Sequence, residues 1–214
     1  MDWAFQRRMM VSRQLRSRGI RDERVLAAML EIPREEFVPE DNRTAAYSDE
    51  PLGIGYGQTI SQPYMTALMV QCLELEGTET VLEVGSGCGY HAAVLGALAA
   101  RVITVELIPE LAAMARLNLE NAGRIGNITV IAADGSLGYP PEAPYDAISV
   151  AAAAAAVPRA LIEQLKDRGR MVIPIGPFAD QELRVLRKQG SEIDWHVAEY
   201  CRFVPLREAA PRVD

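Results

Sequence analysis

From Thr80 onward, short apolar runs alternate with longer segments of helical periodicity. Such alternation predicts a doubly wound, mostly parallel α/β sheet with helices on both faces. Two further apolar runs, separated by a Gln-Gly-Ser turn, predict two antiparallel strands that extend this sheet. The seven predicted strands are 80–84, 101–106, 128–133, 146–150, 170–175, 182–187 and 195–204.

The first third of the chain has a different pattern and predicts an N-terminal helical extension. Residues 22–31 begin with Asp22 in a capping position and have apolar residues at helical spacing, so they predict a short helix. Prolines and glycines interrupt residues 33–59, which we expect to form a structured loop. A second amphipathic helix is predicted over 62–74, and Pro109 and Gly123 bracket a third.

The length of 214 residues and the 49% apolar content are those of a globular chain with one core. We therefore expect a single domain in three parts. These are N-terminal helices with a functional loop (1–75), a cofactor-binding core (76–176) and C-terminal strands (177–214).

Charge and cysteine content narrow the partners. The net charge of −7 does not attract a nucleic-acid backbone, and the basic residues of 1–24 are more typical of a solvated helix face than of an RNA contact. The longest apolar stretch, 147–157, is too short to span a bilayer, and the N-terminus lacks a secretory pattern. Three cysteines without a C-x-x-C pair predict neither disulfides nor a metal site. We expect a cytoplasmic protein, with a monomer favoured.

A glycine-rich turn follows the first strand of the predicted sheet. In VLEVGSGCGY (81–90), glycines 85, 87 and 89 allow a ligand to approach the backbone closely. The dinucleotide fingerprint G-x-G-x-x-G would place its third glycine at Tyr90, which weakens the case for NAD. Glu83 would repel a pyrophosphate but attract a sulfonium or ammonium group. The turn therefore indicates S-adenosylmethionine as the cofactor.

Acidic residues also end the next two predicted strands. Glu106 lies 21 residues after Gly85, at the usual distance for a carboxylate that binds ribose hydroxyls. Asp134 ends the third strand, where it could accept a hydrogen bond from the adenine amine. Each acid alone could be an exposed loop residue or a helix cap. Together with Glu83, they predict one crevice with three carboxylates.

Four segments of the chain resemble the protein-L-isoaspartate O-methyltransferase family. They are GYGQTISQPYMTALM (55–69), VLEVGSGCGY (81–90), DGSLGYPPEAPYDAISV (134–150) and GRMVIPIG (169–176). QTISQP is the most specific, because glycine-rich turns occur in many methyltransferases. The resemblance implies methylation of the free carboxylate of L-isoaspartyl residues in damaged proteins and peptides, followed by repair through a succinimide.

The resemblance also implies roles for individual residues. Ser61 corresponds to the active-site serine, and the acceptor is expected to lie beside Ser61, Val150, Ala151 and Ala152. The cofactor is expected to contact Gln58, Thr59, Ile60, Glu83, Gly85, Ser86, Gly87, Gly89, Glu106, Asp134 and Gly135. Cys88, His91 and the alanine tract 151–156 depart from the family pattern, and the tract bears on peptide preference.

Several alternatives stay open on the sequence alone. Ser61 precedes a predicted helix and could be its N-cap, and composition favours an alanine-rich helix start at 151–156. An isoaspartyl carboxylate is already ionised at pH 7, so we expect Ser61 to orient it rather than act as a nucleophile. Rival functions are a carboxyl methyltransferase for another peptide acceptor, a nucleic-acid methyltransferase, or a non-catalytic S-adenosylmethionine-binding module.

Overall fold

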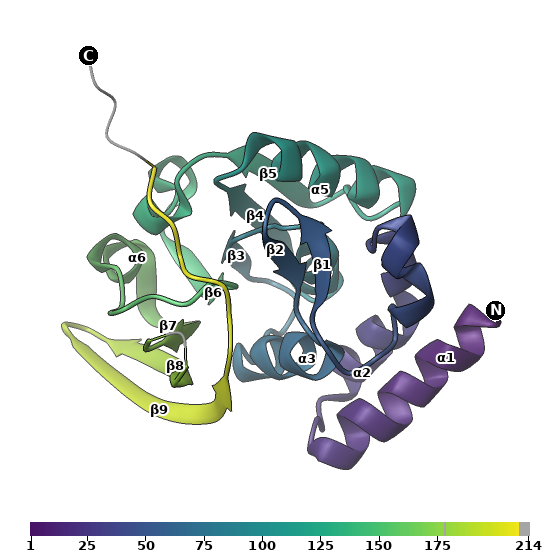
Figure 1. Ribbon diagram of the computed structural model, residues 1–214. Helices are drawn as coiled ribbons and strands as arrows, with labels where there is room; N and C mark the ends of the chain where they lie inside the picture. Colours follow the sequence, from purple (N-terminus) through teal and green to yellow (C-terminus); the bar gives the residue numbers. More distant parts are fainter. Residues whose placement is uncertain (178, 210–214) are drawn as a thin grey trace.

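The computed structural model describes residues 1–177 and 179–209, which form a seven-stranded sheet with helices on both faces (Figure 1). The strand order is β5-β4-β3-β6-β7-β8-β9; the first five are parallel and the last two antiparallel, as predicted. The strands are β3 (Thr80–Val84), β4 (Arg101–Glu106), β5 (Ile128–Ala132), β6 (Tyr145–Val150), β7 (Leu165–Ile175), β8 (Gln181–Gln189) and β9 (Glu192–Cys201).

The strand order reverses direction beside β3. The chain moves from β3 outward to β4 and β5 and then returns to place β6 on the other side of β3. At the end of β3, the Gly85 amide donates to the Val105 carbonyl on one side, and the Ala151 amide donates to the Val84 carbonyl on the other. The loops that follow β3 and β6 therefore separate there, which is where open α/β sheets bind ligands.

Two hydrophobic clusters cover the two faces of the sheet. The first contains residues of α1 (Trp3–Met10), α2 (Glu23–Glu31), α3 (Pro63–Cys72), α4 (Tyr90–Gly96) and α5 (Pro109–Asn121), and the second contains Leu161 of α6 (Arg159–Gln164). The first cluster joins N-terminal, central and C-terminal parts of the chain. Short turns of π or 3₁₀ helix occupy Val11–Leu15, Arg16–Arg18, Arg34–Glu36, Glu40–Ala45, Gly135–Leu137 and Pro140–Glu142.

The prediction of a loop over 33–59 was wrong in part. Besides two 3₁₀ helices, this region contains a hairpin of β1 (Leu52–Gly55) and β2 (Gln58–Ile60). Tyr56 and Gly57 at its tip have φ angles of 54° and 70°, and positive φ at both central residues is what a tight type I′ hairpin turn requires. The glycines that suggested a loop thus serve a hairpin.

The expectation of a helix start at 151–156 was also wrong. The segment consists of bends and two isolated bridge positions, and α6 begins only at Arg159. Ala153 forms a bridge with Pro205, and Ala154 forms one with Ile175. These tertiary contacts override the helical preference of alanine.

The predicted helix caps are partly confirmed. The Asp22 carboxylate caps α2 by accepting from the Arg24 and Val25 amides.

None of the helices in the described part of the chain has both the length and the apolar character that a membrane span requires. Residues 210–214 of the predicted C-terminal part lie outside the described residues.

Candidate active site

The glycine-rich turn connects β3 to α4 at the carboxyl edge of the sheet. Gly89 has a φ angle of +91°, and a Cβ atom there would lie 3.0 Å from the Ala115 carbonyl oxygen of α5. A side chain at this position would therefore meet both backbone strain and a steric contact. One side of the glycine-rich turn therefore packs closely on α5. The backbone on its opposite side lines a cleft.

This cleft encloses about 840 Å³ of space, solvent mouth included, which is within the usual range for a small-molecule site. Its walls come from six separate segments of the chain, which lie within 58–66, 84–91, 105–108, 135, 151–152 and 204–207. Predicted site residues that line it are Gln58, Thr59, Ile60, Ser61, Gly85, Ser86, Gly87, Glu106, Gly135, Ala151 and Ala152. Glu83, Gly89, Asp134 and Val150 are not among its lining residues.

Glu106 lies at the end of β4 with its carboxylate on the cleft wall. One oxygen accepts from the Gly87 amide at 2.9 Å, and the other accepts from the Ile108 amide at 3.0 Å. These bonds fix the carboxylate and also tie down the glycine-rich turn. Because each carboxylate oxygen has two lone pairs, Glu106 can still accept hydroxyl donors from a ligand in the cleft.

Glu83 is fully buried one layer beneath the cleft. In the sheet it pairs with Thr104 and Ser149, two positions deeper along the strands than Glu106. Neither carboxylate oxygen accepts a hydrogen bond from the described residues. Burial raises the pKa of Glu83 to about 8, and the nearby charge of Glu106 acts in the same direction. Glu83 is therefore mostly protonated and neutral at pH 7.

Asp134 lies two residues beyond the end of β5, and its carboxylate accepts hydrogen bonds from neighbouring parts of the chain. Its Oδ1 accepts from the Ser136 amide and hydroxyl at 2.9 and 2.6 Å, and its Oδ2 accepts from the Ala209 amide at 2.7 Å. Partial burial raises its pKa, but these hydrogen bonds outweigh that effect and hold the pKa below its ordinary value. Gly135 and the glycine-rich turn line the same cleft, whereas the Asp134 carboxylate caps a 3₁₀ turn beside it.

His91 is a cleft residue that the sequence marked only as a departure from a pattern. Its side chain is buried, its Nε2 lies 3.3 Å from the Ser149 hydroxyl, and its Nδ1 has no partner among the described residues. Burial lowers the pKa of His91 to about 4 and raises the pKa of Cys88 to about 11. Both side chains are therefore neutral at pH 7, and Cys88 is a buried loop residue rather than a thiolate.

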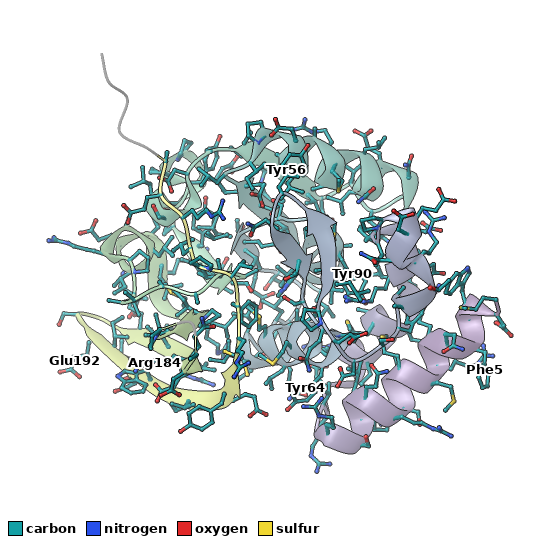
Figure 2. The ribbon with its side chains drawn as sticks, in the orientation of Figure 1. Phe5, Tyr56, Tyr64, Tyr90, Arg184 and Glu192 are labelled. Carbon is teal, nitrogen blue, oxygen red and sulfur yellow. The ribbon has the colours of Figure 1, made fainter. Side chains whose placement is uncertain are left out.

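The hairpin brings Ser61 to the cleft (Figure 2 shows Tyr56 at the hairpin tip). The N-cap of α3 is Gln62, and the Tyr64 amide in its first turn donates to the Asp49 carboxylate, so Ser61 does not cap this helix. The Ser61 carbonyl accepts from Arg34 at 2.8 Å. The Ser61 hydroxyl makes no hydrogen bond to the described part of the chain, so it is free to bind a ligand.

A second hollow, a groove, meets the cleft at Ser61. The two hollows share four lining residues, which are Thr59, Ser61, Ala151 and Val204. The groove continues along β9 and the start of α3, where the Tyr64 hydroxyl donates to Glu199 at 3.3 Å. Val150, predicted on the acceptor side, is fully buried, whereas Ala151 reaches both hollows.

The chain after β9 supplies a wall that sequence reasoning missed. Residues 204–207 line the cleft and are held by Ala153, whose amide donates to the Val204 carbonyl and whose carbonyl accepts from the Leu206 amide. No local motif marks this segment, because its place depends on the alanine tract 50 residues earlier. Within residues 1–177 and 179–209, no group of His, Cys, Asp and Glu side chains is arranged to hold a metal ion.

Comparison with known proteins gives consistent matches over most of the chain. A family model described as protein-L-isoaspartate(D-aspartate) O-methyltransferase matches residues 6–210. Proteins named protein-L-isoaspartate O-methyltransferase from Koribacter versatilis and Methanopyrus kandleri are each 53% identical to the chain; the matches cover 95% and 90% of this chain and 91% and 88% of theirs.

Solved structures agree with these relatives. One protein-L-isoaspartate O-methyltransferase superposes with a TM-score of 0.83 at 30% identity, over 93% of this chain and 65% of its own. A beta-aspartate methyltransferase from Plasmodium falciparum, solved with S-adenosyl-L-homocysteine, superposes with a TM-score of 0.79 at 27% identity, over 95% and 99%.

Proposed function

The chain belongs to the protein-L-isoaspartate O-methyltransferase family, and from this premise we propose which of its residues bind the cofactor and the acceptor. The enzyme uses S-adenosylmethionine to methylate the free carboxylate of L-isoaspartyl residues in damaged proteins and peptides, which starts their repair through a succinimide. One observation carries the assignment of residues: the cleft and the groove meet at Ser61.

The cleft has the features that the cofactor needs. The glycine-rich turn offers open backbone, and the fixed carboxylate of Glu106 has free lone pairs for the ribose hydroxyls. Glu83 is buried beneath this wall, and the hairpin residues 58–60 close the opposite wall. When bound, S-adenosylmethionine supplies a methyl group on a positively charged sulfur. We assign Asp134 a supporting role. Its hydrogen bonds hold Gly135 and the segment near Ala209 at the part of the cleft where we place the adenine.

Ser61 orients the acceptor. An isoaspartyl α-carboxylate has an ordinary pKa well below 7, so it is an ionised nucleophile before it binds. The unpartnered Ser61 hydroxyl can donate to one carboxylate oxygen and leave the other aimed at the cleft. His91 and Cys88 are neutral and buried, and no strong base is required. Positioning and exclusion of water, which are worth about 7 to 11 kcal/mol in such transfers, provide the acceleration.

The remaining assignments rest on charge and composition. We propose that the chain acts as a single domain, because one hydrophobic cluster joins its N-terminal, central and C-terminal parts, and that it acts as a monomer. The net charge of −7 favours peptide over nucleic-acid partners, and three free cysteines fit a reducing cytoplasm.

A paired-peptide assay tests the function directly. Two peptides of identical composition, one isoaspartyl and one aspartyl, are offered with methyl-labelled S-adenosylmethionine. We expect a base-labile methyl ester on the isoaspartyl peptide and none on its aspartyl twin. Labelling of neither peptide, or of both to the same extent, would contradict the proposed acceptor.

A further inference from the structure

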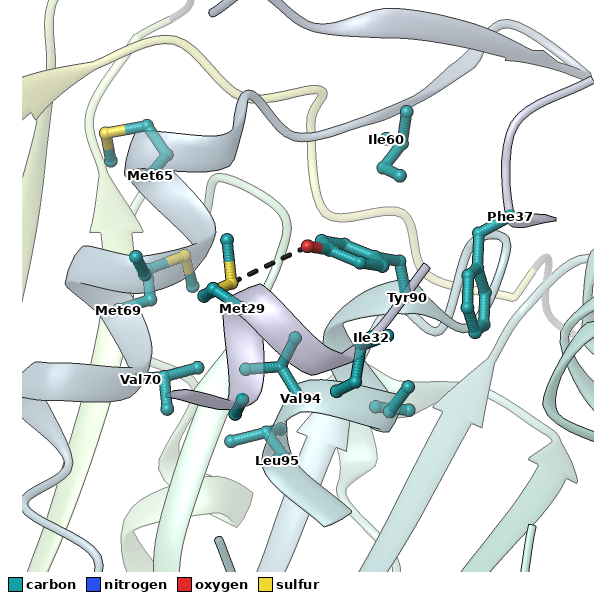
Figure 3. Packing of buried hydrophobic residues seen from close by; sticks show 14 of the residues in the cluster. Met29, Ile32, Phe37, Ile60, Met65, Met69, Val70, Tyr90, Val94 and Leu95 are labelled. Atoms are coloured by element: carbon teal, nitrogen blue, oxygen red, sulfur yellow. Dashed lines mark hydrogen bonds between the residues drawn. The ribbon is translucent and has the colours of Figure 1, made fainter. Parts of the chain in front are cut away.

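Arg34 is a buried cation directly behind the active-site serine. Its side chain is 0% exposed. Its Nε donates to the Ala46 carbonyl at 2.7 Å, and its Nη2 donates to the Ser61 carbonyl at 2.8 Å. The guanidinium carbon lies 4.9 Å from the centre of the Tyr90 ring. Figure 3 shows that this ring is itself fixed, between Met29 and Phe37 and near Ile60.

The charge of Arg34 has no hydrogen-bonded carboxylate partner in the described part of the chain. The adjacent Glu35 is paired with Arg7 and the Tyr47 hydroxyl, and Asp49 is paired with Arg18. The Arg34 Nη1 is buried and has no partner among the described residues. Burial lowers the pKa of Arg34, but a guanidinium stays protonated at neutral pH. Unpaired buried charges are costly, so they are unusual without a function.

The position of this charge relative to the acceptor is set by Ser61. The serine carbonyl that Arg34 binds and the serine hydroxyl belong to one residue, which lines both the cleft and the groove. A carboxylate bound at that hydroxyl therefore lies within roughly 10 Å of the guanidinium. The Arg34 side chain is 0% exposed, so protein surrounds the guanidinium. A fixed cation in such surroundings attracts an anion more strongly than a solvated one does.

We propose that Arg34 makes the acceptor site select an ionised carboxylate over a neutral group of the same shape, acting as a positioning residue through Ser61. The inference rests on the proposed function of this site. Methylation converts the acceptor to a neutral ester, so the same interaction favours binding of the acceptor over retention of the product. Since the attraction is already present before methyl transfer, Arg34 affects the acceptor KM more than kcat.

Three exposed cations are the alternative source of this selectivity. Arg18 and Arg202 line the groove, and Arg207 lines the cleft. The Arg18 side chain is 41% exposed and is paired with Asp49, and Arg202 and Arg207 are exposed. Their attraction for an anion is screened by salt, whereas that of a fully buried guanidinium is screened much less. Salt dependence and separate variants therefore distinguish the two sources.

The test compares two peptides that differ only in charge. One carries an isoaspartyl residue, and the other carries an α-carboxamide in place of its free carboxylate. Binding of each is measured with S-adenosylhomocysteine present, so that no turnover occurs. We expect the wild type to prefer the anionic peptide by about 30-fold, a preference that persists from about 0.05 M to about 1 M salt. Arg34→Met should reduce it to below about 3-fold with unchanged affinity for the neutral peptide, and Arg34→Lys should retain most of it.

Two control variants separate this role from stability and from surface charge. Arg7→Met removes a partly buried arginine that contacts Glu35 and Tyr47 but not Ser61, so it should lower stability without changing the preference. Arg202→Met should lower the preference only at low salt.

If Arg34→Met loses affinity equally for both peptides, Arg34 has only a structural role. If Arg34→Met does not fold, two other results can overturn the proposal. One is a wild-type preference for the anionic peptide that disappears at high salt. The other is loss of that preference in Arg34→Lys. Failure of the wild type to methylate the isoaspartyl peptide would instead contradict the proposed function.

Discussion

The wall of the cleft around the glycine-rich turn comes from a short stretch of chain, whereas the wall around Ser61 is assembled from distant segments. On the first side, residues 83–89 and Glu106 lie within one strand-helix-strand unit. On the second side, Arg34 reaches Ser61 across 27 positions, and Tyr64 reaches Glu199 across 135.

This difference separates the effects of substitutions on the two sides. Changes in the local unit should alter cofactor affinity together with local stability, because the same contacts provide both. Changes in the assembled wall should alter turnover or acceptor affinity while the cofactor still binds. Four variants sharpen or break this comparison, in order of expected effect.

Ser61→Ala should have the largest effect. Loss of the hydroxyl that positions the acceptor is expected to lower kcat by about 10² to 10³-fold. Cofactor affinity and melting temperature should stay at wild-type values, since this hydroxyl makes no hydrogen bond to the described residues. Calorimetric titration of S-adenosylhomocysteine and steady-state kinetics measure both. Ser191→Ala, at the exposed β8–β9 turn, is the matched control, and an equal loss of cofactor affinity in Ser61→Ala would break the comparison.

Gly89→Ala tests the local unit. Its Cβ would lie 3.0 Å from the Ala115 carbonyl in a backbone with a φ angle of +91°, so we expect a loss of about 2 to 3 kcal/mol in the free energy of unfolding, with weaker cofactor binding. Gly190→Ala is the control, because its φ angle is +61° and the space around it is open. That variant should lose only about 1 kcal/mol, from backbone strain alone. Denaturant unfolding compares them, and equal losses would remove the packing argument.

Glu106→Gln should lower cofactor affinity by about 10 to 30-fold. An amide can accept from only one of the two backbone groups, at Gly87 and Ile108, and turns a donor toward the other. Titration with S-adenosylmethionine and S-adenosylhomocysteine should show similar losses for both, as expected for a contact with the shared ribose. Glu110→Gln, exposed in the first turn of α5, should have no effect. A Glu106 variant with wild-type affinity would exclude this carboxylate from the cofactor site.

Glu83→Gln should produce the smallest effect, in the pH dependence of stability. The pKa of Glu83 rises from an ordinary value near 4.5 to about 8, so the folded protein holds a proton that the unfolded chain has released. Its contribution is complete below pH 4.5 and is lost as pH rises toward 8. The pKa of His91, lowered to about 4, gives the opposite slope below pH 6.5. From about pH 6.5 to 8, wild type should therefore lose about 1 to 2 kcal/mol relative to Glu83→Gln. If the free energy of unfolding changes equally with pH in wild type and Glu83→Gln across this range, the argument from burial of Glu83 is contradicted.

The sequence predicted best what depends on neighbours along the chain. Local pattern and spacing predict β3, the glycine-rich turn after it and the end of β4 at Glu106. Each of these lies where it was expected. The depth of Glu83 could not be predicted, because it depends on the register that pairs it with Thr104 rather than with the strand end. Asp134 was misplaced for a related reason, since it lies beyond its strand and bonds to Ser136 and Ala209.

The acceptor side shows why tertiary contacts limit such prediction. Composition favoured a helix start at 151–156, yet bridges from Ala153 and Ala154 hold this segment in a non-helical conformation. Neither the wall at 204–207 nor the contact between Arg34 and Ser61 has a local signal, because each depends on folding that brings distant residues together. The resemblance to a family was therefore more informative on this side than residue chemistry was.

The dependence of the cleft on residues 204–207 has a consequence for shortened forms of the protein. These residues follow every strand of the sheet in the chain and form none of its strands. One wall of the cofactor site therefore depends on the hydrogen bonds that Val204 and Leu206 make to Ala153. A truncation after Phe203, which keeps that buried side chain in the core, should impair methyl-donor binding while the sheet still forms.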